Sequence, residues 1–587
     1  MLLRLVISAA GAVIGVQLLK SIYRHFHWHL FSPFRYMPGP PNPSWLRGNF
    51  WACHCSFHLH PISGDSERPC PQFAQTQEWQ AQYGPTFRFH NLLSATTLYT
   101  IDTVALHRIV NNGDIYQKAP MVRYNMTQLL GQGLLAVEDE EHTKLRKIMS
   151  PAFGLSQITR LTQLFVDKSL ELSEFWARQT ADDNGWARID VLSGLKAVTL
   201  DIIGLAGFNY NFHALDTERE PTELDGAFRQ LFLQIQRRQV RPSTLLRARF
   251  PFLRAILRTP KRLVAARRTM DRIGMHLLQE AKAAARSESN EKDSWRRDIL
   301  TLLVQSNMSK EIPDSQRLSD DVVVAQLPTF FVAGHETTSI ATTWALYALA
   351  LHPEVQTTLR AELLTMGTDS PSLDALNALP YLDKVVREVM RVHSPVVFTN
   401  RMAMRDDVLP LGIPYTDTRG IRHDSIVMSK GQMIYIPVAA LNRDTRIWGP
   451  DAAEFKPDRW DAVPDTAGAI PGVWSHLFSF LGGPHNCIGW RFSLAEMKSL
   501  LYTLVRTFEF ELAVRPEAIG TTRTAVQRPM LVDEPEKGAQ LPMRVRRVET
   551  SNATAEVGEE GTGPDPEGIQ ARRTGSNTSG ILRQRVD

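Results

Sequence analysis

The chain has 587 residues, more than a single compact core usually holds, so we expect one large domain with extensions. Hydrophobic residues make up 43% of it, which excludes a globally disordered protein. The net charge of +4 is only mildly basic and gives no reason to expect a nucleic-acid partner. Four cysteines in so long a chain argue against a disulfide scaffold and fit a reducing compartment.

Residues 1–35 are predicted to be an N-terminal membrane anchor. The run at 5–19 is uncharged and mostly apolar, although it is shorter than the ~20 residues that a spanning helix prefers. Lys20 and Arg24 follow this run and only Arg4 precedes it, so the positive-inside rule places the rest of the chain in the cytosol. The alternative is a cleaved signal peptide, which the basic residues after the apolar run disfavour.

Three further segments differ from the rest in composition. Residues 36–50 are rich in proline and are predicted to be a stiff hinge before the main domain at 51–548. Residues 51–70 contain possible zinc ligands, but their spacing fits no standard finger, so a surface loop is the simpler interpretation. Those residues are Cys53, Cys55, His58, His60 and Cys70. Residues 549–587 have few apolar side chains and are predicted to be a disordered tail.

The first part of the main domain predicts a hairpin and a helix. Residues 83–89 and 97–102 place β-forming side chains around turn residues, which is typical of a hairpin. Residues 138–149 begin with acids and end with Lys and Arg, as a helix prefers. His142 and Arg146 lie four residues apart and would share one face of that helix.

Residues 155–300 are helical in pattern and carry little specific chemistry. Within them, 237–268 is basic and amphipathic. Such a stretch could lie on an anionic membrane surface, and a solvated basic helix is an equally good interpretation.

The long apolar run at 322–351 is expected to be a core helix, because polar residues interrupt its middle. Ala333 and Gly334 are small, so a bulky planar group could lie against this helix. The Thr337 hydroxyl can bond back to the Ala333 carbonyl and open the helix ladder. Glu336 stands beside that hydroxyl, and an acid in an apolar helix is costly unless it serves a purpose.

Residues 480–489 form a glycine-rich loop around Cys487, just before a helical pattern that begins at Trp490. Glycine lets the backbone approach something flat and rigid because it has no Cβ. A thiol at the start of a helix lies near the positive end of the helix dipole, which favours the thiolate. A buried structural cysteine is the usual alternative for any single Cys, and here the surrounding residues favour the chemical interpretation.

This loop resembles the haem-binding loop of the cytochrome P-450 superfamily, the haem-thiolate monooxygenases. The matching positions are Phe480, Gly483, Cys487 and Gly489. Leu481 departs from the family pattern, which more often has a small residue there. The resemblance implies that Cys487 is the axial ligand of the iron of haem b, within a cofactor-binding loop that includes Phe480 and Gly489.

Three more motifs follow the family's order, so the resemblance covers residues 80–515. The contacts implied for the haem propionates come from His142, Arg146, Arg401 and His485. Residues 333–337 match the oxygen-activation motif, in which Thr337 would assist dioxygen activation and Glu336 would help to relay protons.

The last motif is structural. Glu388 and Arg391 lie three residues apart on a predicted helix and match the family's buried Glu-x-x-Arg pair, which Arg459 would join. The residues at 394–399 would line the substrate pocket.

The implied fold is mainly α with a small β portion, the cytochrome P-450 fold, carried on the N-terminal membrane anchor. The implied reaction inserts one atom of dioxygen into a C–H or C=C bond of a lipophilic small molecule. Electrons would come from NADPH through a membrane-bound NADPH-cytochrome reductase, with cytochrome b5 as an optional second donor. Lys144 and Lys147 are docking charges by analogy. The expected location is the endoplasmic reticulum membrane, single-pass, with the catalytic domain in the cytosol.

The style of the motifs resembles fungal members, many of which tailor terpenoids and other secondary metabolites. A fatty-acid or xenobiotic hydroxylase stays open as an alternative. So does an oxygen-independent haem-thiolate isomerase, although such members tend to lack the acid–Thr pair that Glu336 and Thr337 provide. A catalytically silent haem-binding or membrane-adaptor protein is disfavoured by the intact motifs.

Overall fold

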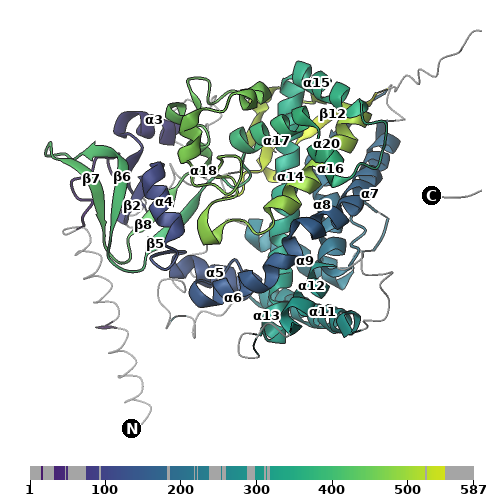
Figure 1. Ribbon diagram of the computed structural model, residues 1–587, viewed down its shortest axis with the longest axis horizontal. Coiled ribbons are helices and arrows are strands. Elements are labelled where there is room, and N and C mark those ends of the chain that lie inside the picture. Colours follow the sequence, from purple (N-terminus) through teal and green to yellow (C-terminus); the bar gives the residue numbers. More distant parts are fainter. Residues whose placement is uncertain are drawn as a thin grey trace, which may run out of the picture. The chain divides into compact units, whose positions relative to one another are not determined.

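The computed structural model describes residues 15–16, 32–45, 48–49, 74–91, 94–180, 185–216, 218–220, 222–236, 253, 260–286, 298–309, 313, 317–522 and 525–548. All of them belong to the unit Met1–Val548. This part of the chain is mostly helical with a small strand portion, as expected. Figure 1 shows strands β2 and β5–β8 grouped beside α4, apart from the helices around α14.

The helices are α3 (Ala74–Tyr83), α4 (Thr103–Asn111), α5 (Pro120–Leu130), α6 (Asp139–Met149), α7 (Leu155–Thr180), α8 (Val191–Phe208), α9 (Glu223–Gln236), α11 (Lys261–Arg286), α12 (Ile299–Met308), α13 (Asp320–Val324), α14 (Gln326–Leu351), α15 (Pro353–Leu364), α16 (Leu373–Asn377), α17 (Pro380–Val392), α18 (Val438–Leu441), α19 (Thr445–Trp448) and α20 (Trp490–Thr507). The helices predicted at 138–149 and 381–391 are confirmed as α6 and α17.

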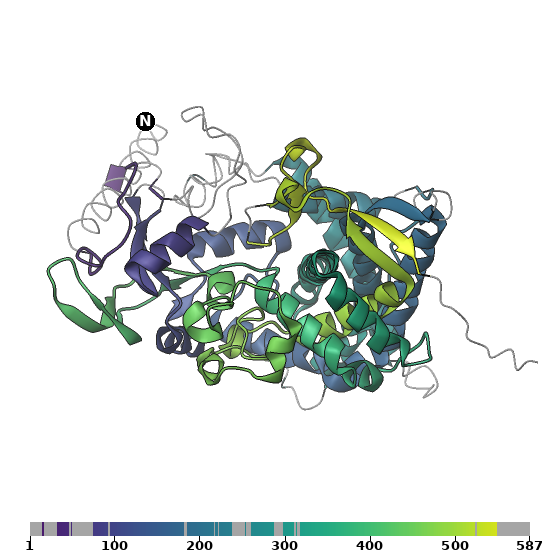
Figure 2. The same cartoon turned by 90° about the horizontal axis from the view of Figure 1, so that it is seen from above.

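The strands are β1 (Thr86–His90), β2 (Thr96–Thr100), β3 (Tyr116–Gln117), β4 (Trp186–Asp190), β5 (Thr399–Ala403), β6 (Asp407–Thr416), β7 (Arg422–Met428), β8 (Met433–Ile436), β9 (Phe508–Leu512), β10 (Ile519–Thr521), β11 (Pro529–Leu531) and β12 (Pro542–Arg547). One sheet has the order β1-β2-β8-β5-β3, in which only β2 and β8 are parallel. The predicted hairpin is confirmed as β1 paired with β2. Figure 2 shows the green hairpin β6–β7 extending beside this sheet.

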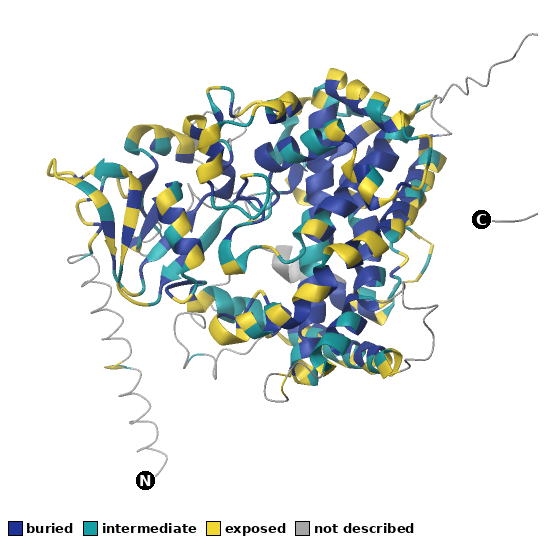
Figure 3. Ribbon diagram, viewed as in Figure 1, coloured by how far each residue is buried: buried dark blue, intermediate teal, exposed yellow. Residues whose placement is uncertain are grey.

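Helix α14 is the centre of the helical part. It packs against α8, α17 and α20, and Figure 3 shows most of its residues buried. The expected core helix is therefore confirmed, with its start divided into α13 and α14. A Cβ on Gly334 would lie 2.8 Å from Ile203 of α8, so this glycine lets α8 and α14 pack closely. The expected planar group against this surface stays a prediction.

Among the described residues, α8 is the only helix long and apolar enough to cross a membrane. Buried residues make up 72% of it, which identifies a core helix by its packing. The predicted anchor lies almost wholly outside the described residues, as do the 51–70 segment, most of the basic 237–268 stretch and the 549–587 tail.

The buried ion network predicted around Glu388 is confirmed. Arg391 Nη2 donates to Glu388 Oε1 (2.7 Å) and Arg391 Nε donates to Glu388 Oε2 (2.8 Å), with both side chains inaccessible to solvent. Arg459 Nε reaches Glu388 Oε1 at 3.4 Å, and Trp460 Nε1 donates to Glu388 Oε2 at 3.1 Å. The network therefore joins α17 to the irregular segment that precedes the cysteine loop.

Candidate functional site

The cysteine loop is closed by its own backbone. The Cys487 amide donates to the Phe480 carbonyl (2.9 Å), and Gly489 is the last residue before α20. Phe480 is buried and packs edge-on against Trp474. Leu481 has φ +57°, in the left-handed region that favours glycine, which is where the family more often has a small residue.

The close backbone contacts in this loop explain two of its glycines. A Cβ on Gly482 would lie 1.7 Å from the Pro471 carbonyl oxygen, and one on Gly483 would lie 2.2 Å from that of Val110. Contacts within the protein therefore require these two glycines, and the expected approach of a flat ligand to the loop stays a prediction.

The Cys487 thiol has an accessible surface although protein surrounds it. Burial raises the pKa of this thiol, while a backbone hydrogen bond from Gly489 and the charge of Arg146 act in the opposite direction. Cys487 is thus a free cysteine with an exposed side chain, so a ligand could reach its sulfur.

Part of α14 is accessible as well. Ala333, Gly334 and Thr337 are partly accessible, whereas 326–331 and 338–346, on either side of them, are buried. The Thr337 hydroxyl donates to the Ala333 carbonyl (2.7 Å), and this confirms the predicted back-bond. This back-bond thus lies on the accessible part of the helix.

Cationic side chains gather around a single carboxylate, Glu138, at the start of α6. Glu138 Oε1 lies 3.0 Å from Lys118 Nζ, and Glu138 Oε2 lies 2.7 Å from His485 Nε2. Burial would raise the pKa of Glu138, but His485 and Lys118 outweigh it and hold the pKa at about 2. His142 stacks on His485 at 3.9 Å, and burial together with the His485 charge lowers the pKa of His142 to about 3.

Arg401 of β5 is buried close to this cluster. Its guanidinium donates to the Thr399 hydroxyl (2.8 Å) and the Asn400 carbonyl (2.9 Å). Burial lowers the pKa of Arg401, and the charge of Glu138 opposes that shift. Among the described residues, no carboxylate forms an ion pair with Arg401. A negatively charged group could therefore pair with this buried guanidinium.

The Arg146 side chain contacts the cysteine loop. Both of its terminal nitrogens donate to Asn486, one to the backbone oxygen and one to the side-chain oxygen. Arg146 therefore ties α6 to the cysteine loop, next to Cys487, whereas its α6 neighbour His142 lies against His485.

Glu336 is not a free acid. Its carboxylate is buried and forms an ion pair with Arg528, which lies 192 residues further along the chain. No local pattern in the sequence points to Arg528, because the pair depends on a long-range contact. Glu138 was missed for the same reason, since His485 and Lys118 become its neighbours only through the fold.

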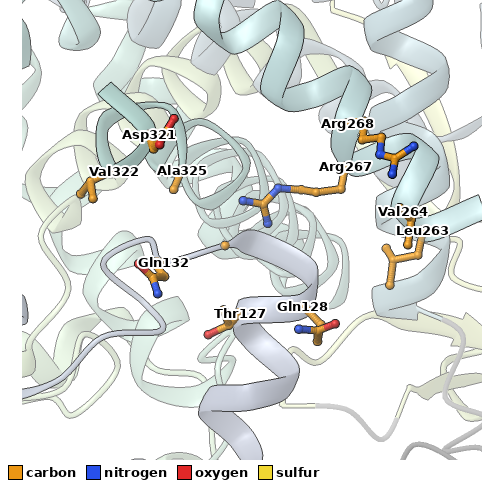
Figure 4. A pocket seen from close by; sticks show the side chains of 11 residues that line it. Thr127, Gln128, Gln132, Leu263, Val264, Arg267, Arg268, Asp321, Val322 and Ala325 are labelled. Carbon is orange, nitrogen blue, oxygen red and sulfur yellow. The ribbon is translucent and has the colours of Figure 1, made fainter. Parts of the chain in front are cut away.

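A surface pocket lies at the N-terminal end of α14. Its volume is about 410 Å³, and it lies between the end of α5, helix α11 and the α13–α14 junction. Figure 4 shows Arg267 of α11 pointing into it, toward the chain between Thr127 and Gln132. Arg267 also pairs with Asp271 at 2.9 Å. The structure describes the C-terminal end of the basic 237–268 stretch, and Arg267 and Arg268 belong to this end.

Comparison with known proteins identifies the family. The family model described as Cytochrome P450 matches residues 65–532. The chain is 48% identical to cytochrome P450 monooxygenase 205 of Postia placenta, over 88% of this chain and 94% of that protein. It is 46% identical to cytochrome P450 monooxygenase 128 of the same fungus, over 92% and 97% of the two chains.

A more distant relative is cytochrome P450 monooxygenase claQ of Ampulloclitocybe clavipes, 34% identical over 81% of this chain and 88% of that protein. The helical fold, the accessible cysteine and these matches define one class of protein. The chain belongs to the cytochrome P450 family and is an oxidoreductase, and the family implies a haem-thiolate iron.

Proposed function

We propose that this protein is a monooxygenase that hydroxylates or epoxidises a lipophilic small molecule. One oxygen atom of dioxygen enters the substrate and the other leaves as water, which consumes two protons and the two electrons of one NADPH. The observation that carries the proposal is Cys487, a free and exposed cysteine in a loop just before α20. Haem bound against this loop would supply the dioxygen-activating iron.

The residues present fit a haem. Cys487 would hold the iron, with Phe480 and Gly489 at the two ends of its loop. Buried cations without enough carboxylates are what two haem propionates require, and Arg401 has no acidic partner among the described residues. His485 and His142 would contribute on the same side, and Arg146 would act there or through Asn486.

The proposed catalytic residues are Thr337 and Glu336 on α14. Thr337 is partly accessible, and its hydroxyl, which donates to the Ala333 carbonyl, can accept a hydrogen bond from a bound group. Glu336 would hold a proton source close to that hydroxyl. The presence of this acid–Thr pair favours an oxygen-dependent reaction over an isomerase.

The proposed setting is the endoplasmic reticulum membrane. Residues 1–35 would be a single-pass anchor, 36–50 a hinge and 51–548 the cytosolic catalytic domain, followed by a disordered tail at 549–587. Electrons would come from an NADPH-cytochrome reductase, with cytochrome b5 as a second donor. Lys147 is exposed on α6 and could dock the reductase, whereas Lys144 already donates to the Arg317 carbonyl (3.0 Å).

The substrate is proposed to be a secondary metabolite of terpenoid type, since the relatives are fungal monooxygenases. A fatty acid or a xenobiotic is the second candidate, because both are also lipophilic small molecules.

Turnover under dioxygen labelled with oxygen-18 tests the proposal. Full-length protein in microsomes is supplied with NADPH and reductase and incubated with terpenoids, fatty acids and aromatic xenobiotics. We expect one labelled oxygen atom in the product. A product formed equally well without dioxygen would establish the isomerase alternative instead.

A further inference from the structure

The strongest unexplained feature of the site is the ion pair that holds Glu336. Arg528 Nε and Nη2 both approach Glu336 Oε1, and the two side chains are only 4% and 3% exposed. Removing either partner of so well buried an ion pair destabilises the fold, because the remaining charge is left without a counter-ion.

Lys196 of α8 interacts electrostatically with this pair. Burial, and then the charge of Arg528, lower the pKa of Lys196, while the charge of Glu336 opposes that shift. The neighbouring His335 contacts its own helix, since its Nδ1 lies 2.7 Å from the Phe331 carbonyl oxygen. The ion-pair partner of Glu336 is Arg528, so the carboxylate is oriented from outside α14.

Arg528 lies on a segment that the fold fixes at several points. Val526 forms a bridge with Val396, and the Gln527 amide donates to the Pro395 carbonyl (2.8 Å). Trp344 Nε1, on α14, donates to the Gln527 carbonyl (2.9 Å). The segment 525–528 is thus bonded both to α14 and to the 394–399 segment, which is the predicted lining of the substrate pocket.

We infer that Arg528 is a positioning residue for the oxygen-activation step. It fixes the carboxylate of Glu336, the residue before Thr337, and connects that acid to the 394–399 segment, the predicted lining of the substrate pocket. The inference rests on the proposed monooxygenase function, since it assigns a role to Arg528 as the partner of the proposed catalytic acid Glu336. Arg528 itself need not touch the substrate or the cofactor.

The test compares Arg528→Gln, Arg528→Lys and Glu336→Gln in the full-length, haem-loaded protein with reductase. General acid groups contribute on the order of 10²–10⁴ in rate, so Arg528→Gln should raise peroxide released per product by roughly 10-fold or more. The KM for substrate should stay unchanged while the kcat for product falls. Arg528→Lys should restore part of the coupling, because it keeps the charge but not the guanidinium fork.

The double variant Glu336→Gln with Arg528→Gln separates positioning from independent action. Its uncoupling should equal that of either single variant, because both act on one group. Urea unfolding gives a second readout that needs no turnover: the double variant should lose less stability than the sum of the single variants, since neither charge is stranded.

Trp344→Phe is the matched control, because it removes the bond to Gln527 but leaves the ion pair intact. It should retain wild-type coupling. If Arg528→Gln also kept wild-type coupling while Glu336→Gln lost it, the inference would be overturned. Equal uncoupling in Trp344→Phe and Arg528→Gln would overturn it too, in favour of simple anchoring of the segment. Absence of product in the wild-type protein would instead refute the proposed function.

Discussion

At the scale of single residues, comparing Thr337 with Thr343 tests whether the Thr337 hydroxyl has a chemical role besides its bond within the helix. It donates to the Ala333 carbonyl on the accessible face of α14, whereas the Thr343 hydroxyl makes the same back-bond to Ser339 (2.7 Å) in the buried part. We expect Thr337→Val to raise peroxide released per NADPH several-fold, because the shape stays and the hydroxyl is lost. Thr343→Val is the control and should leave this ratio unchanged. Fully coupled turnover in Thr337→Val would count against the proposed role.

His393 predicts a pH dependence of stability. Burial, and then the charges of Arg443 and Arg391, lower its pKa to about 3 from the ordinary 6.5, and its ring stacks on Trp344. Because the folded-state pKa lies below that of the unfolded chain, the unfolded state binds the proton more readily. Stability from this group is complete above pH 6.5 and falls as the pH drops toward 3, by about 1.4 kcal/mol per unit.

Urea unfolding across that pH window measures this effect. The variant His393→Phe should show a shallower loss of unfolding free energy on acidification than the wild-type protein. Parallel curves for the two proteins would contradict the assignment of this slope to His393.

At the scale of elements, the Glu388 network joins α17 to the segment before the cysteine loop. Glu388→Gln removes the only carboxylate among the described residues that pairs with Arg391, and we expect a loss of roughly 3–5 kcal/mol in unfolding free energy. Glu511→Gln is the matched control, because its pair with Arg544 is about half exposed and should contribute at most ~1 kcal/mol. Equal losses in the two variants would show that burial does not decide the effect.

The elements also show how far the sequence could predict this fold. Local patterns were sufficient for α6, α14, α17 and the β1–β2 hairpin, because capping charges, apolar runs and turn residues are short-range signals. Strand β12 pairs with β4, and this three-stranded sheet brings together segments from opposite ends of the domain. Such pairings have no local signature and could not be derived from one sequence.

The candidate site shows the same division. Three features depend on residues close together in the sequence, and all were predicted. They are the cysteine loop, the Thr337 back-bond and the Glu388 pair. The partners of Glu336 and Glu138 come from distant segments and were missed. The contacts of the glycines at 334, 482 and 483 with Ile203 and with backbone carbonyls also come from distant segments and were missed.

At the scale of the whole molecule, the proposed orientation predicts the state of the glycosylation sequons. Asn125 begins an Asn-Met-Thr sequon on α5. If the catalytic domain faces the cytosol, this sequon stays unmodified, and endoglycosidase treatment of microsomes leaves the mobility of the protein unchanged. A sequon added before Arg4 is the control and should be glycosylated. Glycan on Asn125 would contradict the orientation.

The central claim is that Cys487 holds a haem iron as a thiolate. The carbon monoxide difference spectrum of the reduced, membrane-bound protein tests it most directly, with Cys487→Ala as the matched variant. We predict a strongly red-shifted Soret band in the wild-type protein and its loss in Cys487→Ala. Bound haem without that band in the wild-type protein would contradict thiolate ligation, and absence of bound haem would contradict the assignment of the site.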